Sequence, residues 1–250
     1  MKLSSQVVGA ALNGSRTAAE HPRIPRTPDE LAAAARAAAD AGAQVLHFHP
    51  YDGAGRESLA PGPCAAALEA VRAACPQLPL SLTTSLAVEP DPARRVALVS
   101  AWSVLPDLVT ANQGEPGIAE LCRHLRSRGV GIEAGLLSAA DAEAFVASGL
   151  VGDCVRVLIE PLDADPDVAV AHAARMEEIL ARARVSLEQM HHGDGVASWA
   201  VNRRAVGRGH GIRTGLEDTT VLPDGRPARD NSELVEAAVA MIRRFTDMTP

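Results

Sequence analysis

The chain has 250 residues, 47% of them hydrophobic, and carries a net charge of −7. It can bury a full core as one α/β domain, since barrels of this class commonly occupy about 250 residues. The negative charge argues against nucleic acid or an anionic membrane as partner, although it leaves room for a local basic pocket. No apolar run reaches the roughly 18 residues of a membrane span, and no signal peptide is evident, so we expect a cytoplasmic protein.

Cysteine and lysine usage excludes some chemistry. Four cysteines are scattered without the close pairing of metal knuckles or redox motifs, which predicts reduced core thiols at Cys64, Cys75, Cys122 and Cys154. Lys2, at the start of the first expected strand, is the only lysine, so a Schiff-base mechanism has no credible nucleophile. Carbon–carbon bond chemistry would therefore depend on a metal or on acid and base groups.

Short apolar runs alternate with alanine-rich helical stretches along the chain. We expect eight strands, at residues 3–12, 44–49, 78–83, 108–111, 130–134, 154–159, 186–191 and 211–216. Helices should begin near Pro28, Pro63, Asp91, Pro116, Ser138, Pro166 and Val196, and after Asn231. Capping signals support two of these starts, Thr27-Pro-Asp-Glu30 and Ser138-Ala-Ala-Asp141. Gly42, Gly129 and Gly149 fit helix C-termini.

Eight alternating strands and helices without a composition break predict a (β/α)8 TIM barrel, formed by residues 1–250 as a single domain. An open doubly wound sheet is the alternative, but no G-x-G-x-x-G turn follows the first expected strand. In a barrel, functional groups gather at the C-terminal ends of the strands. The polar residues expected there are His47, His49, Thr83, Thr84, Thr110, Asn112, Glu133, Glu160, His191, His192, Glu217 and Asp218.

An apolar strand that ends in His-x-His is the most informative of these features. His47 and His49 are two positions apart, so a strand directs both imidazoles to the same face. Two imidazoles form half of a zinc site, and Glu217 or Asp218 offers the carboxylate that is missing. The alternatives are hydrogen-bonded core histidines, and carboxylates that cap a helix or lie on the surface.

Several segments resemble the β-keto acid cleavage enzymes of the 3-keto-5-aminohexanoate type. They are Ala11-Leu-Asn-Gly14, Thr27-Pro-Asp-Glu30, Gly42-Ala43 leading into His47-Phe-His49-Pro50, Arg213-Thr-Gly-Leu-Glu-Asp218, and Asn231. The likeness covers nearly the whole chain. Its specific part is His-x-His combined with Arg-x-x-x-Glu-Asp at the end of the last expected strand.

The resemblance implies a reaction and a role for each matching residue. A β-keto acid and acetyl-CoA would yield acetoacetate and a new acyl-CoA by a retro-Claisen exchange. His47, His49 and Glu217 match the zinc ligands, Asp218 the acid–base residue and Arg213 its guanidinium partner. Thr83, Thr110 and Asn112 match hydroxyl and amide contacts to the substrate. Exposed helical faces also make a homo-oligomer the expected assembly.

Two departures from the family pattern concern substrate binding. Arg16 stands where the aminohexanoate enzyme has an acid that meets the substrate amine, which predicts an anionic or polar substrate tail, such as that of a dicarboxylic β-keto acid. Thr83-Thr-Ser-Leu86 replaces the usual Ser-Thr-Gly-Gly, so Ser85 and Leu86 would narrow the pocket or block backbone contacts. Glu133 is a further substrate-binding candidate, and pairing with Arg156 is its structural alternative.

Other interpretations remain open at this stage. Glu160, His191 and His192 have structural alternatives, and the basic face at Arg203, Arg204 and Arg208 is either solvated or attracts the phosphates of coenzyme A. Two functional alternatives are a metal-dependent hydrolase or class II aldolase, and a barrel without activity. The lack of a lysine for carbamylation disfavours an amidohydrolase, and retention of all five metal and acid–base residues disfavours an inactive barrel.

Overall fold

The computed structural model describes residues 6–248 and contains a closed barrel of eight parallel strands in chain order. This confirms the (β/α)8 prediction and rules out the open sheet. Lys2 and residues 3–5 of the first expected strand lie outside the described residues. The strands are β1 (Val8–Ala11), β2 (Val45–Phe48), β3 (Leu80–Thr83), β4 (Leu108–Asn112), β5 (Gly131–Leu136), β6 (Arg156–Ile159), β7 (Glu188–His191) and β8 (Gly211–Thr214).

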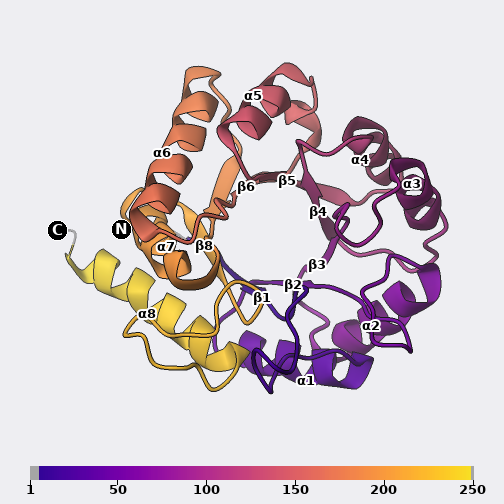
Figure 1. The fold of residues 1–250 in the computed structure, drawn as a ribbon, viewed down its shortest axis with the longest axis horizontal. Helices are drawn as coiled ribbons and strands as arrows, with labels where there is room; N and C mark the ends of the chain where they lie inside the picture. The colour runs from indigo at the N-terminus through magenta and orange to yellow at the C-terminus, as the bar shows by residue number, and fades with distance from the viewer. Residues whose placement is uncertain (1–5, 249–250) are drawn as a thin grey trace.

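Helices surround the strands in a ring that follows the order of the chain (Figure 1). They are α1 (Pro28–Asp40), α2 (Pro61–Ala74), α3 (Pro92–Ser100), α4 (Ile118–Ser127), α5 (Ala139–Ala147), α6 (Pro166–Arg182), α7 (Ser198–Gly207) and α8 (Asn231–Met248). Two short 3-10 helices, η1 (Val151–Asp153) and η2 (Gly195–Ala197), precede β6 and α7. None of the helices within residues 6–248 is long and apolar enough to cross a membrane.

Local capping explains where the helices start. Thr27 with Glu30, and Ser138 with Asp141, form complete capping boxes, as their sequences predict. Three other starts differ from expectation. α2 begins two residues early, α4 begins two residues late because Gly117 has a φ of 75°, and η2 precedes α7. A left-handed residue cannot continue a helix, so the α4 start moves past it.

Successive side chains of each strand point alternately out of and into the barrel, which produces two separate apolar clusters. Outward-facing residues such as Leu46, Leu82 and Ile132 pack with the helices in the main apolar cluster. Inside the barrel, Val45, Leu108, Leu158 and Met190 form a separate apolar cluster. The four cysteines are free and buried, which confirms the prediction of core thiols. The barrel is therefore a packed core whose polar residues face its C-terminal mouth.

The last strand ends earlier than predicted because of Gly215. A Cβ on this residue would lie 1.9 Å from the carbonyl oxygen of Ala11, and its φ is 154°. The close approach lets the Glu217 N–H donate to that carbonyl at 3.2 Å. Asn231, at the start of α8, accepts from the Leu216 N–H at 2.8 Å and donates to the Leu12 carbonyl at 2.9 Å. The chain after β8 is thereby fixed against the end of β1.

Candidate active site

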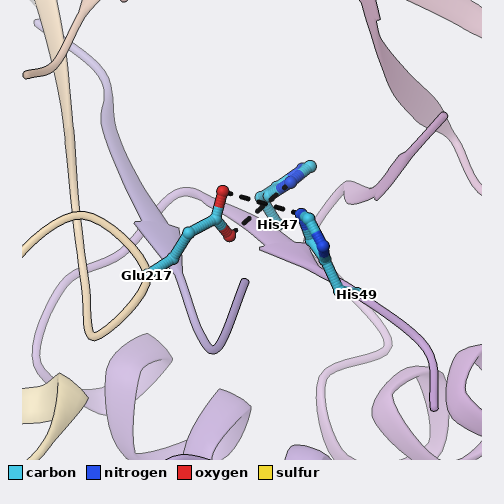
Figure 2. A group of neighbouring side chains, drawn as sticks. All are labelled: His47, His49 and Glu217. Carbon is cyan, nitrogen blue, oxygen red and sulfur yellow. Dashed lines mark ion pairs between the residues drawn. The ribbon is translucent and has the colours of Figure 1, made fainter. Parts of the chain in front are cut away.

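His47, His49 and Glu217 face one another at the C-terminal mouth of the barrel (Figure 2). The distances are 3.7 Å from His47 Nε2 to Glu217 Oε2 and 3.6 Å from His49 Nε2 to Glu217 Oε1. One potential ligand atom from each residue lies within 4.8 Å of the others. The three residues singled out by the sequence therefore come together in space, although β2 and the loop after β8 are far apart along the chain.

The remaining ring nitrogens are engaged on the side away from Glu217. His47 Nδ1 lies 3.2 Å from Ser81 Oγ and 3.4 Å from Thr110 Oγ1. His49 Nδ1 makes a short hydrogen bond with Glu57. Such partners fix the orientation of an imidazole and raise its basicity as a metal ligand. Both Nε2 atoms are therefore directed at the space beside Glu217.

Asn13 and Gly14 brace this arrangement from the end of β1. The buried Asn13 amide accepts from the His49 N–H at 2.9 Å and donates to the His49 carbonyl at 2.9 Å. Gly14 has a φ of 56°, and a Cβ there would lie 2.4 Å from Glu217 Cγ. The Asn-Gly pair thus holds one histidine in place and leaves room for the carboxylate.

The chemistry of these three residues fits a divalent metal. Glu217 Oε2 is buried without a hydrogen-bond partner among the described residues, and its distances to the imidazoles exceed those of ordinary hydrogen bonds. Burial lowers the pKa of His47 to about 3, which keeps this imidazole neutral. Burial would also lower the pKa of His49, but Glu217 and Glu57 outweigh it and raise the value to about 9. Metal binding at His49 would release that proton.

Arg213 lies beside the candidate metal ligands and connects several carboxylates. Its Nη2 lies 2.6 Å from Asp218 Oδ1 and 3.1 Å from Glu217 Oε1, and its Nε lies 3.3 Å from Asp218 Oδ2. Burial would lower the pKa of Arg213, but Asp218, Glu217 and Glu160 outweigh it and raise it. Burial would raise the pKa of Glu217, yet Arg213 and the two imidazoles hold it well below its usual value. Arg213 and Glu217 are therefore ionised.

A pocket of about 460 Å3 opens above these residues. Most of the predicted site residues line it, namely Arg16, His47, His49, Thr83, Ser85, Thr110, Asn112, Arg213 and Glu217. Ser15, Glu20, Leu137, Glu160, Leu162 and Asp194 also contribute to its wall. Two predicted residues are not part of that lining. Asp218 is 3% exposed and lies behind Arg213, and Glu133 lies deeper in the barrel.

Glu133 is held by two neighbours inside the barrel. It accepts a 2.5 Å hydrogen bond from Ser81 Oγ, and Arg156 Nε lies 3.6 Å from its other oxygen. Burial raises the pKa of Glu133. The pairing with Arg156 corresponds to the structural alternative, while Ser81 connects Glu133 to His47. A direct contact between Glu133 and substrate stays a prediction.

Arg16 contacts two backbone carbonyls and two carboxylates of the protein. Its guanidinium donates to the carbonyls of Glu217 at 2.9 Å and Asp218 at 3.4 Å. It also pairs with Asp194 at 2.9 Å and Glu20 at 3.3 Å. Its charge is therefore already shared between two carboxylates at the rim of the pocket.

The loops after β3 and β4 are joined through Glu115. This carboxylate accepts from Asn112 Nδ2 at 3.0 Å and from the Leu86 N–H at 3.1 Å. Ser85 Oγ lies 3.4 Å from the same oxygen. The fully buried Arg95 pairs with Glu115 and donates to the Thr84 carbonyl at 3.2 Å. Ser85, which lines the pocket, and Leu86, which is not part of its lining, thus lie in a fixed loop.

The structure shows the partners of the other basic and histidine residues that the sequence singled out. Arg204 and Arg208 both pair with Glu177, so one carboxylate offsets part of their charge, while Arg203 is exposed. Attraction of the coenzyme A phosphates to this face stays a prediction. His191 faces away from the barrel and stacks on His210 with ring centroids 4.8 Å apart. His192, in contrast, lies between Glu160 and Asp218.

Sequence reasoning missed several functional neighbours. Ser81 lies two positions before Thr83, so the period of a strand could have identified it on the inner face. Glu57 lies in the loop after β2, where no periodic signal marks it. Glu115 and Arg95 contact each other only because α3 lies beside the loop that follows β4.

Comparison with known proteins places these residues in a family. The model of the beta-keto acid cleavage enzymes matches residues 6–192 and 163–248. The 3-keto-5-aminohexanoate cleavage enzyme of Acetoanaerobium sticklandii is 23% identical over 255 residues, which cover 96% of this chain and 92% of that protein. The enzyme of the same name from Fusobacterium nucleatum subsp. nucleatum is 24% identical over 261 residues, with the same coverage.

Solved structures show the same fold at low identity. The ternary complex of ObcA with a C4-CoA adduct and oxalate has a TM-score of 0.73 and 18% identity, covering 89% of this chain. The complex of ObcA with oxaloacetate has a TM-score of 0.70 and 19% identity, covering 88% of this chain. This chain spans less than two thirds of ObcA, 64% and 63% of those two chains. Because the family model matches nearly all of the described residues, the chain belongs to the beta-keto acid cleavage enzyme family.

Proposed function

We propose that this protein is a zinc-dependent enzyme that condenses a β-keto acid with acetyl-CoA and releases acetoacetate and a new acyl-CoA. Family membership supports the cleavage of a β-keto acid. The ObcA complex with a C4-CoA adduct supports a CoA thioester as the second substrate. The observation that carries the proposal is the convergence of His47, His49 and Glu217 on one space at the floor of the pocket.

His47, His49 and Glu217 would hold the metal ion. Three protein ligands leave a coordination position for substrate, as is typical of catalytic zinc sites. When bound, the ion would supply a Lewis acid for the keto and carboxylate oxygens of a β-keto acid. Other divalent ions that accept imidazole and carboxylate ligands also suit this donor set.

Asp218 and Arg213 would perform the proton transfer. Asp218 removes a proton from the carbon between the keto and carboxylate groups, and the resulting carbanion attacks the carbonyl carbon of acetyl-CoA. The CoA thiolate leaves and then attacks the original keto carbon. The bond from that carbon to the carbanion carbon breaks, and Asp218 returns its proton to give acetoacetate. Arg213 keeps the Asp218 carboxyl group oriented through both transfers.

The pocket wall would select the substrate. Thr83, Ser85, Thr110 and Asn112 offer hydroxyl and amide groups to the substrate oxygens and tail. Of the two tails that Arg16 suggests, anionic or polar, a polar tail is better supported. The reason is that Glu20 and Asp194 already compensate the Arg16 charge. The cytoplasmic location and the homo-oligomer stay predictions, and light scattering would test the second.

The test is a panel of β-keto acids with different tails, incubated with acetyl-CoA and the zinc-loaded protein. We expect acetoacetate and the matching acyl-CoA in equal amounts, measured by mass spectrometry, with the highest rates for polar tails. Asp218→Asn should lower the rate by about a hundredfold or more. The absence of acetoacetate from every panel member would overturn the proposal. Turnover without acetyl-CoA would instead indicate the hydrolase or class II aldolase alternative.

A further inference from the structure

His192 is a buried histidine whose two ring nitrogens face two different carboxylates. It follows β7 directly and is 1% exposed. Its Nε2 lies 3.3 Å from Glu160 Oε2, at the end of β6. Its Nδ1 lies 3.5 Å from Asp218 Oδ1, in the loop after β8. Neither ring nitrogen makes a hydrogen bond to a described residue, so the two ion pairs are the polar contacts of the ring there.

This geometry favours a charged imidazole ring. A neutral imidazole carries one N–H, whereas an ionised carboxylate only accepts hydrogen bonds. Facing two carboxylates therefore favours protons on both nitrogens. The charged and titratable groups around His192 are Glu160, Asp218, Arg213 and the preceding His191. Burial and Arg213 lower the pKa of His192, but Glu160 and Asp218 outweigh them and raise it to about 9.

The charge balance around Arg213 shows what this ring contributes. Three carboxylates surround the Arg213 guanidinium, with Nη2 distances of 2.6 Å to Asp218, 3.1 Å to Glu217 and 3.9 Å to Glu160. Glu217 is also paired with His47 and His49, which leaves one guanidinium for Asp218 and Glu160. His192 supplies a second cation on the side that faces Asp218 and Glu160. Glu160 lines the substrate pocket, whereas Asp218 lies behind Arg213.

We propose that His192 is a positioning residue for the reaction: as an imidazolium it bridges Glu160 on the pocket wall to Asp218, and so fixes Asp218 against Arg213. The assignment rests on the proposed function, in which Asp218 moves the proton. A small displacement of such a base is costly, because about 1 Å of misplacement can lower a rate by about a hundredfold.

The kinetic test replaces His192 with glutamine, which has one amide donor group and no charge. We expect His192→Gln to lower kcat by about 10- to 100-fold, with KM for both substrates changed by less than about threefold. His191→Gln is the matched control. His191 is equally buried and lies one residue earlier, but it faces outward onto His210. We expect kcat of this control to stay within about threefold of wild type, even where thermal stability falls.

A second measurement detects the protonation of His192 independently of catalysis. In zinc-loaded protein with 15N-labelled histidine rings, NMR at pH 7.5 should show both His192 nitrogens protonated, and Glu160→Gln should lower the protonated fraction. A neutral His192 ring in the wild type would overturn the assignment, as would equal kinetic losses in the His191 and His192 variants. If wild type forms no acetoacetate but shows the doubly protonated ring, the proposed function fails and the bridge stands.

Discussion

Gly14 controls the position of Glu217 more directly than any polar contact does. A Cβ at this residue would lie 2.4 Å from Glu217 Cγ, on a backbone with a φ of 56°. We expect Gly14→Ala to push the carboxylate away from His47 and His49 and to weaken zinc binding at least about tenfold. The strained backbone should also cost about 1–2 kcal/mol of unfolding free energy. Zinc titration and urea unfolding measure the two effects separately.

Gly55→Ala is the control for backbone strain. Gly55 also has a positive φ, 74°, but a Cβ there meets nothing within 4 Å. This variant should lose about 1 kcal/mol of unfolding free energy and keep its zinc affinity. If both alanine variants bound zinc as the wild type does, the close approach of Gly14 to Glu217 would not matter for the site.

The sequence predicts the three residues of the candidate metal site because their signals are simple. Two histidines at a spacing of two share a strand face, and the Glu-Asp pair follows the last strand. Glu57 could not be predicted in the same way, because its bond to His49 depends on how a loop folds back over β2. His191 and His192 illustrate the same limit. Adjacent residues face opposite sides of the barrel, and only the register of β7 decides which one is inside.

Arg95 links two structural elements, the loops that follow β3 and β4. Its side chain is fully buried, pairs with Glu115, and donates to the carbonyls of Thr84 at 3.2 Å and Pro116 at 2.7 Å. We expect Arg95→Met to lower the unfolding free energy by about 3–5 kcal/mol, because the change leaves a largely buried carboxylate without its partner. Urea unfolding monitored by circular dichroism provides the measurement.

The neighbouring arginine is the matched control for this pair. Arg94 is the residue before Arg95 on α3, but its side chain is 70% exposed and lies 3.1 Å from Glu89. An exposed ion pair contributes little, so Arg94→Met should change the unfolding free energy by less than about 1 kcal/mol. Similar losses in both variants would show that helix propensity, and not the buried pair, determines the result.

At the level of elements, the sequence predicts all eight strands and their order, with ends that shift by a few residues. Continuous apolar runs are a strong signal for parallel strands covered on both faces. The helix starts were less predictable. The α4 prediction was wrong by two residues because the left-handed conformation of Gly117 delays the helix, and η2 precedes α7. Such conformations depend on neighbouring loops as well as on local propensity.

In the whole molecule, the buried charges around Arg213 and Glu177 lie in groups that contain both signs. Around Arg213, three carboxylates and an imidazole share the mouth of the barrel. On the outside, Glu177 of α6 pairs with Arg204, Arg208 and His210 near the end of α7. The sequence showed the arginines as a basic face, but the buried acid that compensates them lies on another helix. Closure of the barrel brings the two helices together.

This outer group predicts how stability depends on pH. Burial would raise the pKa of Glu177, but hydrogen bonds from Arg208, His210 and Arg204 outweigh it and lower it from 4.5 to about 2. A depressed carboxyl pKa stabilises the fold fully above pH 4.5, and that stabilisation is lost as pH falls toward 2. Because exposed Arg208 is screened by solvent, we expect this group to contribute about 1 kcal/mol to the unfolding free energy.

Urea unfolding at pH 7, 4.5 and 3 should therefore show that Glu177→Gln is less stable than wild type at pH 7. Between pH 4.5 and 3, this variant should lose less unfolding free energy than wild type does. Glu178→Gln, which removes the exposed neighbouring acid, should retain a slope closer to wild type; identical slopes in the wild type and Glu177→Gln would contradict the prediction.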